Sequence, residues 1–342
     1  MATIKDVARL AGVGLGTASR VVSGKGSVSP ATLAKVRAAI EQLDFRPSHA
    51  ARSLLSGSSR MIGVYIPVLS GTFYTPILQV IDTELRTAGL HMVVAFGVGL
   101  GGARQQAIDG IAFLIERGCD GLILMTNVLQ EEDIAALGAR QHQVVLLNHH
   151  FDSIGAQCFT VDHQLGGRLA ARTLIEHGHR RIAVVAGPSS LPDNVLRVDA
   201  FMHELADHGI DTAKVWLVER DFSPAGGWSA ARELVESGHA CTAMFCANDE
   251  MAVGALSYFQ EAGIHVPSEL SVIGYDDTPS AEFSAPRLTT VHMPWREMTR
   301  NGLNALLNGC YDLQRPVTHD YPVTVTLRAS LAKAGRKKSS KT

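Results

Sequence analysis

Several features that define common classes of protein are missing from this sequence of 342 residues. No run of apolar residues reaches the roughly eighteen that a membrane-spanning helix requires. The amphipathic opening MATIKDVARLAGV also lacks the apolar stretch of a secretory signal. The five cysteines are odd in number and form no C-x-x-C pair, so they indicate neither a disulfide framework nor a zinc site. We therefore expect a cytoplasmic protein, with no membrane partner, whose cysteines are buried free thiols.

Sequence motifs of common enzyme classes are missing too. The chain has no G-x-S-x-G nucleophile elbow, no Walker phosphate loop and no G-x-G-x-x-G after an expected strand. The glycine-rich run GVGLGGAR at 97–104 has a different spacing. His149, His150 and His163 lack the spacing of metal ligands. We expect no enzymatic activity, no cofactor and no bound metal.

The charged residues are distributed unevenly along the chain. The whole chain has a formal net charge of −2, but residues 1–60 carry nine Lys and Arg against three Asp and Glu. Residues 333–342 add five basic residues and no acidic one, which leaves 17 basic and 30 acidic residues in between. A basic N-terminal region on an acidic body indicates that only this region meets a polyanion.

The N-terminal region has the start and stop signals of three short helices. The expected helices cover residues 4–11, 15–23 and 30–44. Thr3 is a good cap for the first helix, and Gly12 ends it. Ser29 followed by Pro30 at the first helical position is a strong start signal for the third. The region is therefore expected to be all-α.

The first two of these helices have the features of a helix-turn-helix. Ala8, Gly12 and Ala18 are small enough for the two helices to cross closely. The outer side of the second helix carries Leu15, Gly16, Thr17, Ser19 and Arg20. Such a helix fits the major groove of DNA, where Arg20 can make a bidentate contact with guanine. A three-helix protein-binding module with a solvated basic face is the alternative.

The segment TIKDVARLAGVGLGTASRVVSGKGSVSPATLAKVRAAIEQLDFRPSHAARSL resembles the DNA-binding head of the lactose-repressor/galactose-repressor (LacI/GalR) family of transcription regulators. The resemblance implies a hinge over residues 47–56 that folds beside a partner hinge on operator DNA. By alignment Leu54 is the side chain that wedges into the minor groove. The DNA contacts that the resemblance implies are Thr3, Leu15, Gly16, Thr17, Ser19, Arg20, Ser29, His49, Ala51 and Leu54.

Two positions depart from the family pattern. Gly14 stands where a hydroxyl residue usually caps the recognition helix, and Gly16 offers no side chain to a base. We therefore expect base readout to depend on Leu15, Thr17, Arg20 and Leu54.

From residue 61 onward, short apolar runs alternate with helical segments. The expected strands lie at 62–68, 91–97, 121–125, 144–148, 159–162, 181–187, 216–219, 243–248, 271–276 and 289–293. Continuous apolar strands separated by helices are typical of parallel sheets covered on both faces. Because ten strands exceed one comfortable sheet, we expect two doubly wound α/β subdomains with a ligand cleft between them.

Segments such as FCANDEMAVGAL and LSVIGYDDTPSAEFSAPRLTTV extend the resemblance to the LacI/GalR body, which is similar in fold to periplasmic sugar-binding proteins. The resemblance implies three crossings between the subdomains, near Asp162, Val291 and Pro322. The expected divisions are a helix-turn-helix domain at 1–46, a hinge and linker at 47–60, an N-subdomain at 61–161 and 292–322, a C-subdomain at 162–291 and 323–331, and a disordered basic tail at 332–342.

Polar residues at the ends of expected strands mark the ligand site. The effector-binding residues that the resemblance implies are Phe73, Tyr74, Arg197, Phe222, Asn248 and Asp276. A guanidinium, a carboxamide and a carboxylate suit a ligand with vicinal hydroxyls, and aromatic rings suit its apolar face. A simple ion pair between Arg197 and Asp276 is the alternative for those two. Asp249 and Asp277 are expected to be helix caps or contacts between domains.

These features together predict a repressor that binds palindromic double-stranded operator DNA as a homodimer and responds to a small-molecule effector. A sugar that acts as inducer is the favoured effector. The alternatives are a purine or a phosphorylated metabolite acting as co-repressor, or a carbohydrate-binding protein without a role on DNA. The last residues contain no leucine heptads, so a dimer is expected rather than a tetramer.

Overall fold

A computed structural model describes residues 2–23, 27–45, 58–97 and 101–335. The hinge residues His49, Ala51 and Leu54, part of the glycine-rich run at 97–104 and the last residues 336–342 lie outside this described part. Within the described part, no helix is both long enough and apolar enough to span a membrane.

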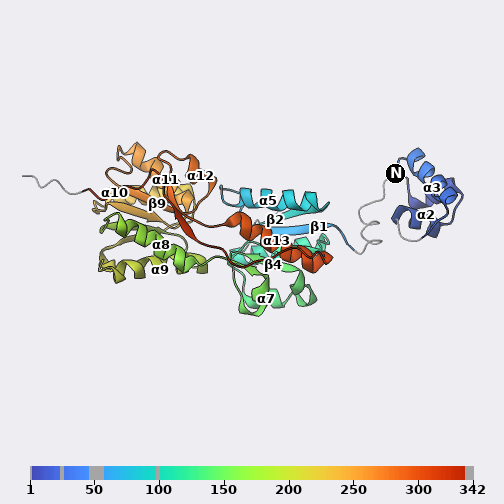
Figure 1. Cartoon of the computed structure of the whole chain (residues 1–342), viewed down its shortest axis with the longest axis horizontal. Coiled ribbons are helices and arrows are strands. Elements are labelled where there is room, and N and C mark those ends of the chain that lie inside the picture. The colour runs from blue at the N-terminus through green and yellow to red at the C-terminus, as the bar shows by residue number, and fades with distance from the viewer. Residues whose placement is uncertain (1, 24–26, 46–57, 98–100, 336–342) are drawn as a thin grey trace, which may run out of the picture.

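The head consists of three helices around a small core. They are α1 (Ile4–Ala11), α2 (Leu15–Ser23) and α3 (Pro30–Gln42) (Figure 1). Thr3 caps α1 in a reciprocal capping box with Asp6, and Ser29 caps α3 by accepting a hydrogen bond from the Thr32 amide at 3.3 Å. The core consists of Val7, Ala11, Val36, Ala39 and Phe45. The expected helices are confirmed, except that α3 ends two residues early, before Asp44 with its positive φ of 40°.

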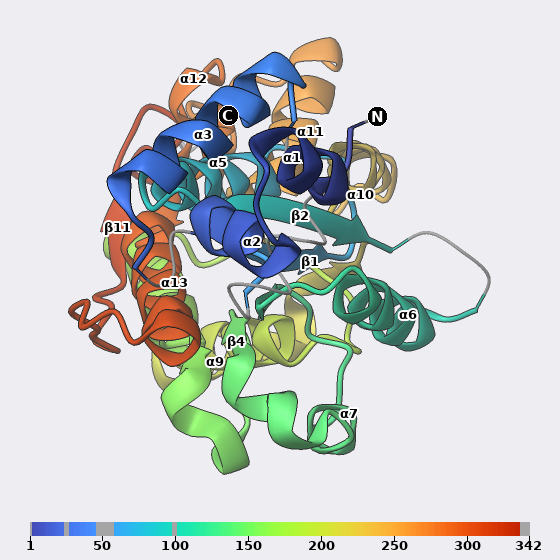
Figure 2. The ribbon, with the colours of Figure 1, turned by 90° about the vertical axis from the view of Figure 1, so that its right-hand side faces the viewer.

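The N-subdomain is built on a five-stranded parallel sheet with the strand order β2-β1-β3-β4-β5. Its strands are β1 (Met61–Ile66), β2 (His91–Phe96), β3 (Gly121–Leu124), β4 (Val144–Leu147) and β5 (Cys158–Phe159). Its helices are α5 (Tyr74–Thr87), α6 (Ala103–Glu116), α7 (Glu131–Ala135) and α13 (Trp295–Tyr311), with 3₁₀ helices at Gly138–Gln143 and Asp152–Gln157. Figure 2 shows α6 on the opposite side of the sheet from α5 and α13.

Alternation along β1 explains these two layers. Ile62, Val64 and Ile66 belong to the apolar cluster that includes α5, whereas Tyr65 belongs to the separate cluster with Ile111 of α6. Successive side chains of a strand point to opposite faces, so an uninterrupted apolar strand is buried on both.

The C-subdomain contains a six-stranded sheet with the order β11-β10-β9-β8-β6-β7. Its strands are β6 (Ile182–Ala186), β7 (Trp216–Glu219), β8 (Ala243–Cys246), β9 (Ser271–Asp276), β10 (Thr289–His292) and β11 (Thr324–Thr326). Its helices are α8 (His163–Glu176), α9 (Pro192–Asp207), α10 (Pro224–Glu236), α11 (Asp249–Glu261) and α12 (Pro279–Phe283), with a 3₁₀ turn at Thr212–Lys214. In Figure 1, α8 and α9 lie on one side of this sheet and α10 and α11 on the other.

All ten expected strands are present, and β11 is an eleventh that the sequence did not reveal. It pairs antiparallel with β10, whereas the other pairs of this sheet are parallel. Its three residues are exposed or half-buried, so they lack the apolar run that marked the other strands.

The chain passes between the subdomains at three places, after β5, after β10 and before β11. The C-terminal segment continues the C-subdomain further than expected. The Ala334 amide donates to the His177 carbonyl at 2.8 Å, and His179 Nε2 lies 3.0 Å from the Ala332 carbonyl. Residues 332 and 334 therefore contact the C-subdomain.

Candidate effector pocket and DNA-binding surface

A cavity of about 470 Å³ lies between the two subdomains. We call it the inner pocket. Its walls include Pro67 after β1, Asn127 after β3, Pro188 after β6, Phe222 after β7 and Asn248 after β8. Ligands of parallel α/β sheets bind beyond the carboxyl ends of strands, as here. The six residues expected to bind the effector all line this pocket: Phe73, Tyr74, Arg197, Phe222, Asn248 and Asp276.

Arg197 is the central polar group of the inner pocket. It lies in the second turn of α9 and is only 3% exposed. Its Nη2 donates to Asp193 at 3.0 Å, while its Nη1 lies 3.8 Å from Asp276 and donates to the Ala247 carbonyl at 2.5 Å. The guanidinium carbon also lies 4.1 Å from the centre of the Tyr275 ring. Arg197 therefore interacts with two carboxylates. Its contact with Asp276 is the longer one, so Asp276 can still accept hydrogen bonds from a ligand.

Asp276 ends β9 with its carboxylate buried at the pocket wall. Burial raises the pKa of this carboxyl well above its ordinary value, although Arg197 opposes the rise. The backbone φ of 109° lies in the left-handed region, which non-glycine residues rarely adopt. Asn148 and Phe222 also have positive φ, 61° and 65°. Strained backbone of this kind concentrates at functional sites.

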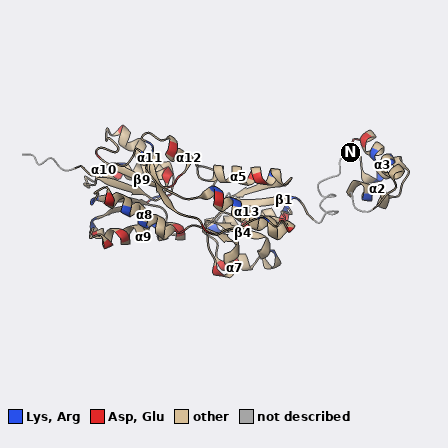
Figure 3. Ribbon diagram, in the orientation of Figure 1, with Lys and Arg blue, Asp and Glu red and all other residues tan. Residues whose placement is uncertain are grey.

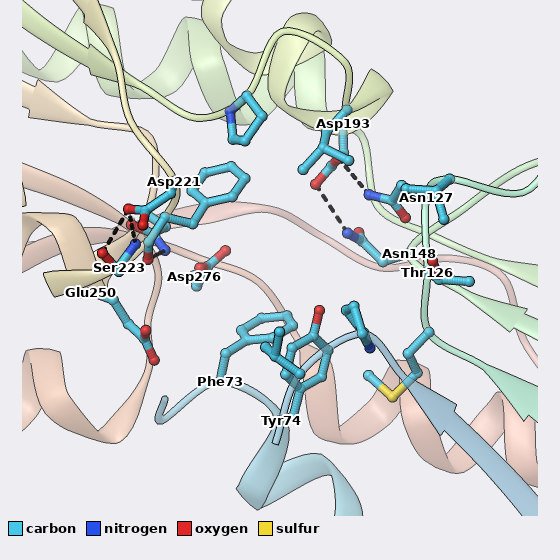
Figure 4. A pocket seen from close by; sticks show the side chains of 18 of the residues that line it. Phe73, Tyr74, Thr126, Asn127, Asn148, Asp193, Asp221, Ser223, Glu250 and Asp276 are labelled. Atoms are coloured by element: carbon cyan, nitrogen blue, oxygen red, sulfur yellow. Dashed lines mark hydrogen bonds between the residues drawn. The ribbon is translucent and has the colours of Figure 1, made fainter. Parts of the chain in front are cut away.

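Aromatic side chains form much of the remaining wall (Figure 4). The Phe73 ring meets Tyr74 edge-on at 5.0 Å and Trp295 edge-on at 4.6 Å. Phe222 reaches the pocket because Gly187 has no side chain, since a Cβ there would lie 2.0 Å from the Phe222 ring. Trp295 was not expected from the sequence. Its indole donates to the Asp276 carbonyl at 3.2 Å.

Asn248 has a second role beside its place in the wall. Its Oδ1 accepts a hydrogen bond from the Met251 amide at 2.9 Å and so caps α11, and its Nδ2 donates to the Phe222 carbonyl at 2.9 Å. Asn248 therefore holds Phe222 and the helix start in place, and part of its hydrogen-bonding capacity is already used.

Asp193 was missed by sequence reasoning and joins the two subdomains across the pocket. Its carboxylate accepts from Asn127 Nδ2 at 2.5 Å and from Asn148 Nδ2 at 3.2 Å, both from the N-subdomain (Figure 4). We call these three residues the gate. The i,i+4 spacing of Asp193 and Arg197 on one helix was the available signal.

Asp249 and Asp277 are expected from the sequence to be helix caps or contacts between domains, whereas their side-chain hydrogen bonds lie within the C-subdomain. Asp249 accepts hydrogen bonds from the backbone and side chain of Thr278 and from the Thr290 hydroxyl, all within the C-subdomain. Asp277 accepts from His292 at 2.8 Å, Thr326 at 3.1 Å and Arg328 at 2.7 Å. Asp277 therefore ties together two of the strands through which the chain crosses between subdomains.

The surface of the head is basic and presents the second helix. All five Lys and Arg of its described residues are exposed, and Figure 3 marks those of α2 and α3. Leu15, Gly16 and Arg20 are exposed on α2, whereas Thr17 and Ser19 are half-buried. The Gly14 carbonyl accepts the first helical hydrogen bonds, so glycine serves at the start of α2 without a side-chain cap.

Comparisons with known proteins identify relatives for both the DNA-binding head and the ligand-binding body. Residues 3–48 match the family model "Bacterial regulatory proteins, lacI family", and residues 171–331 match "Periplasmic binding protein-like domain". The regulator GalS of Salmonella typhimurium is 32% identical over 97% of both chains. The repressor PurR of Vibrio atlanticus is 34% identical over 91% of this chain and 93% of its own. The lac repressor dimer bound to operator has a TM-score of 0.82 and 29% identity, over 97% of this chain and 99% of that one.

These relatives are regulators of transcription and not enzymes. The match over the head also overrules a sugar-binding protein without a role on DNA and a head that binds only protein. On the strength of both regions and of identity along nearly the whole chain, the protein belongs to the LacI/GalR family of DNA-binding transcriptional regulators.

Proposed function

We propose that this regulator is a homodimeric repressor which binds a palindromic operator and releases it when an uncharged sugar occupies the inner pocket. The observation that carries the proposal is the position of Arg197 between Asp193 and Asp276, next to aromatic faces. Hydroxyl groups donate to carboxylates and accept from guanidinium, so neighbouring hydroxyls suit this arrangement. The apolar face of a sugar ring suits the aromatic wall.

The charge of the inner pocket favours an uncharged ligand over a phosphorylated one. Four carboxylates line it, those of Asp193, Asp221, Glu250 and Asp276, and Arg197 is their single Lys or Arg counterpart among the lining residues. Three of these carboxylates also raise the pKa of Tyr74, in addition to the larger effect of its burial. A phosphate group would meet net repulsion here, because Coulomb interactions strengthen where water is excluded.

A purine is the second candidate effector. The 34% identity to PurR and the flat rings of Phe73, Phe222 and Trp295 favour it, since aromatic rings stack on planar bases as well as on sugars. A purine would act as co-repressor and strengthen operator binding.

The proposed DNA contacts are those on the outer side of α2, with Arg20 as the main base-reading side chain.

Dimerisation is supported by large apolar side chains that one copy leaves in solvent. Phe283 is 81% exposed and Leu69 is 61% exposed. The segments that carry them approach each other, because the Thr72 hydroxyl lies 3.3 Å from that of Ser280. A second copy that covers them would place two heads on one symmetric body.

The test is binding of the purified full chain to palindromic DNA at fixed salt, followed by fluorescence anisotropy. Glucose, galactose, cellobiose, lactose, hypoxanthine and glucose 6-phosphate are each added in turn. We expect a neutral sugar to weaken specific binding at low millimolar concentration or below. Stronger binding with hypoxanthine, or a response to the phosphorylated sugar alone, would show that the effector assignment is wrong.

A further inference from the structure

A second and larger cavity lies next to the inner pocket. Its volume is about 1040 Å³, and we call it the outer compartment. It shares the three gate residues, Ala103 and Val128 with the inner pocket, so the two spaces meet at the gate. From the proposed function, we infer that the outer compartment is a second sugar subsite and that the effector is a disaccharide or longer glycoside.

The size of the two spaces supports this inference. Small-ligand pockets measure about 300–1,000 Å³, so the inner pocket alone already suffices for one small unit. The outer compartment, on the other side of the gate residues, has more than twice the volume of the inner pocket. A ligand of two or more units would use both spaces and would be recognised by both subdomains.

The lining of the outer compartment suits an uncharged polyol. Its hydrogen-bonding side chains include Gln130, His149, Thr160 and Ser190. A ring surface stands beside them, because His149 meets Phe151 edge-on at 4.4 Å. The buried Nε2 of His149 has no hydrogen-bond partner among the described residues. A ligand hydroxyl bonded to this nitrogen would supply the missing partner.

The charges of the outer compartment disfavour an anion. Arg104 points its guanidinium at Asp133, with both hydrogen bonds at 2.9 Å. Glu131, Glu132 and Asp193 also line the space. Burial lowers the pKa of His149, and burial together with Arg197 lowers that of His163 to about 3. These two imidazoles are therefore uncharged at neutral pH and do not balance the carboxylates.

The gate gives this second subsite a direct connection to the first. Asp193 uses one carboxylate to hold Arg197, Asn127 and Asn148. His163 Nε2 lies 2.8 Å from the Asn148 Oδ1, and its Nδ1 lies 3.4 Å from Arg197. A ligand that spans both cavities would replace some of the hydrogen bonds among these groups. Binding in the second subsite would therefore change the hydrogen bonds of Arg197.

The test compares each disaccharide with its own monosaccharides in the full-length protein, by calorimetry. Glucose is paired with cellobiose and maltose, and galactose with lactose. We expect one disaccharide to bind at least tenfold more tightly than its component monosaccharides. Leu196 of α9 lines only the outer compartment and is 41% exposed, so Leu196→Trp is expected to fill that space without disturbing the core.

Leu196→Trp should weaken the disaccharide at least tenfold and change monosaccharide binding less than twofold. Leu196→Ala is the matched control, and Phe222→Ala in the inner pocket should weaken both ligands. Unchanged operator affinity of each variant without sugar establishes that it is folded. Equal binding of monosaccharide and disaccharide, or equal losses for both with Leu196→Trp, would overturn this inference but leave the proposed function standing. If no sugar of either length binds, both are overturned.

Discussion

The head and the body of this regulator assemble their recognition surfaces in opposite ways. In the head, three of the four side chains expected to read bases, those of Leu15, Thr17 and Arg20, come from the nine consecutive residues of α2. In the body, the inner pocket is made by residues that follow several strands and by the starts of α5, α9 and α13. A contiguous surface is fixed by one helix, whereas a convergent one depends on the packing of both subdomains. Substitutions in the two regions should therefore separate DNA binding from effector binding.

The largest expected effect is on effector binding, from Asp276→Asn. The amide keeps the size of the side chain and tolerates the positive φ, but it replaces one acceptor oxygen with a nitrogen that cannot accept a bond from a ligand hydroxyl. A buried polar group left without its partner costs about 1–3 kcal/mol, so we expect sugar affinity to fall up to about 100-fold. Operator affinity without sugar should change less than twofold. Calorimetry and anisotropy measure the two quantities, and an equal loss in both would show that Asp276 supports the fold instead.

The counterpart in the head is Arg20→Ala. A bidentate contact to guanine contributes about 1–3 kcal/mol of discrimination, so we expect operator affinity to fall about 10-fold to 100-fold. Affinity for unrelated DNA should fall only slightly, and sugar affinity should not change. Arg37→Ala removes an equally exposed charge from α3 and is the matched control. If both variants weaken operator and unrelated DNA alike, Arg20 contributes charge but no base readout.

A smaller loss of effector binding is expected from Gly187→Ala. The new Cβ would overlap the Phe222 ring, which must then leave the pocket wall. We expect about tenfold weaker sugar binding, in line with a stacking contribution of about 0.5–1.5 kcal/mol beyond buried area. Gly16→Ala is the control in the head, where a Cβ meets nothing within 4 Å. Normal sugar binding by Gly187→Ala would mean that Phe222 is no part of the site.

Residues 58–60 are the described end of the segment between the two regions, and Asp120 holds them to the N-subdomain. Its carboxylate accepts from the Ser58 hydroxyl at 2.6 Å, the Ser59 amide at 2.8 Å and the Arg60 amide at 2.8 Å. The Tyr311 hydroxyl donates to it as well, at 2.7 Å. This carboxylate therefore anchors the segment through which a change in the body would reach the head.

Asp120→Asn should weaken that coupling without touching either binding surface. An amide nitrogen facing these donors loses at least one hydrogen bond, at about 0.5–1.5 kcal/mol each. We expect the ratio of operator affinities without and with saturating sugar to shrink about fivefold, while sugar affinity stays unchanged. Tyr311→Phe removes the hydroxyl that donates to Asp120 but keeps the carboxylate, and it should have a smaller effect. An unchanged ratio in Asp120→Asn would exclude this anchor from the coupling.

Features formed by neighbouring residues in the sequence could be predicted, whereas contacts between residues far apart in the sequence could not. The head helices, the ten expected strands and the six pocket residues follow from local patterns and from the family resemblance. Asp193 did not, because an acidic residue in the first turn of a helix is common and its partner Asn127 lies 66 positions away. Trp295 was also not predicted, because its pocket neighbours are far away in the sequence. It enters the pocket from the start of α13, after the second crossing between the subdomains. The short strand β11 carries no apolar run and is defined only by its pairing with β10.

The smallest expected effect is a pH dependence of stability at the crossing strands. A hydrogen bond with Asp277 raises the pKa of His292 above its ordinary value of 6.5. The folded state then holds this proton more tightly than the unfolded state. The stabilisation is therefore complete below pH 6.5 and is lost as the pH rises through the raised pKa. Because His292 is 43% exposed, screening by water keeps the contribution below about 1 kcal/mol.

His292→Gln should remove this dependence, so its melting temperature should fall less than that of the unchanged protein between pH 6.5 and 8.5. The range matters because buried His163, with its pKa lowered to about 3, loses stabilisation in the other direction, as the pH falls from 6.5 toward 3. Thermal melts monitored by circular dichroism at constant ionic strength measure the difference. Arg328 also holds Asp277, at 2.7 Å, and keeps that carboxylate paired at every pH in this range. Parallel melting curves for the two proteins above pH 6.5 would mean that the bond between His292 and Asp277 contributes nothing to holding the crossing strands together.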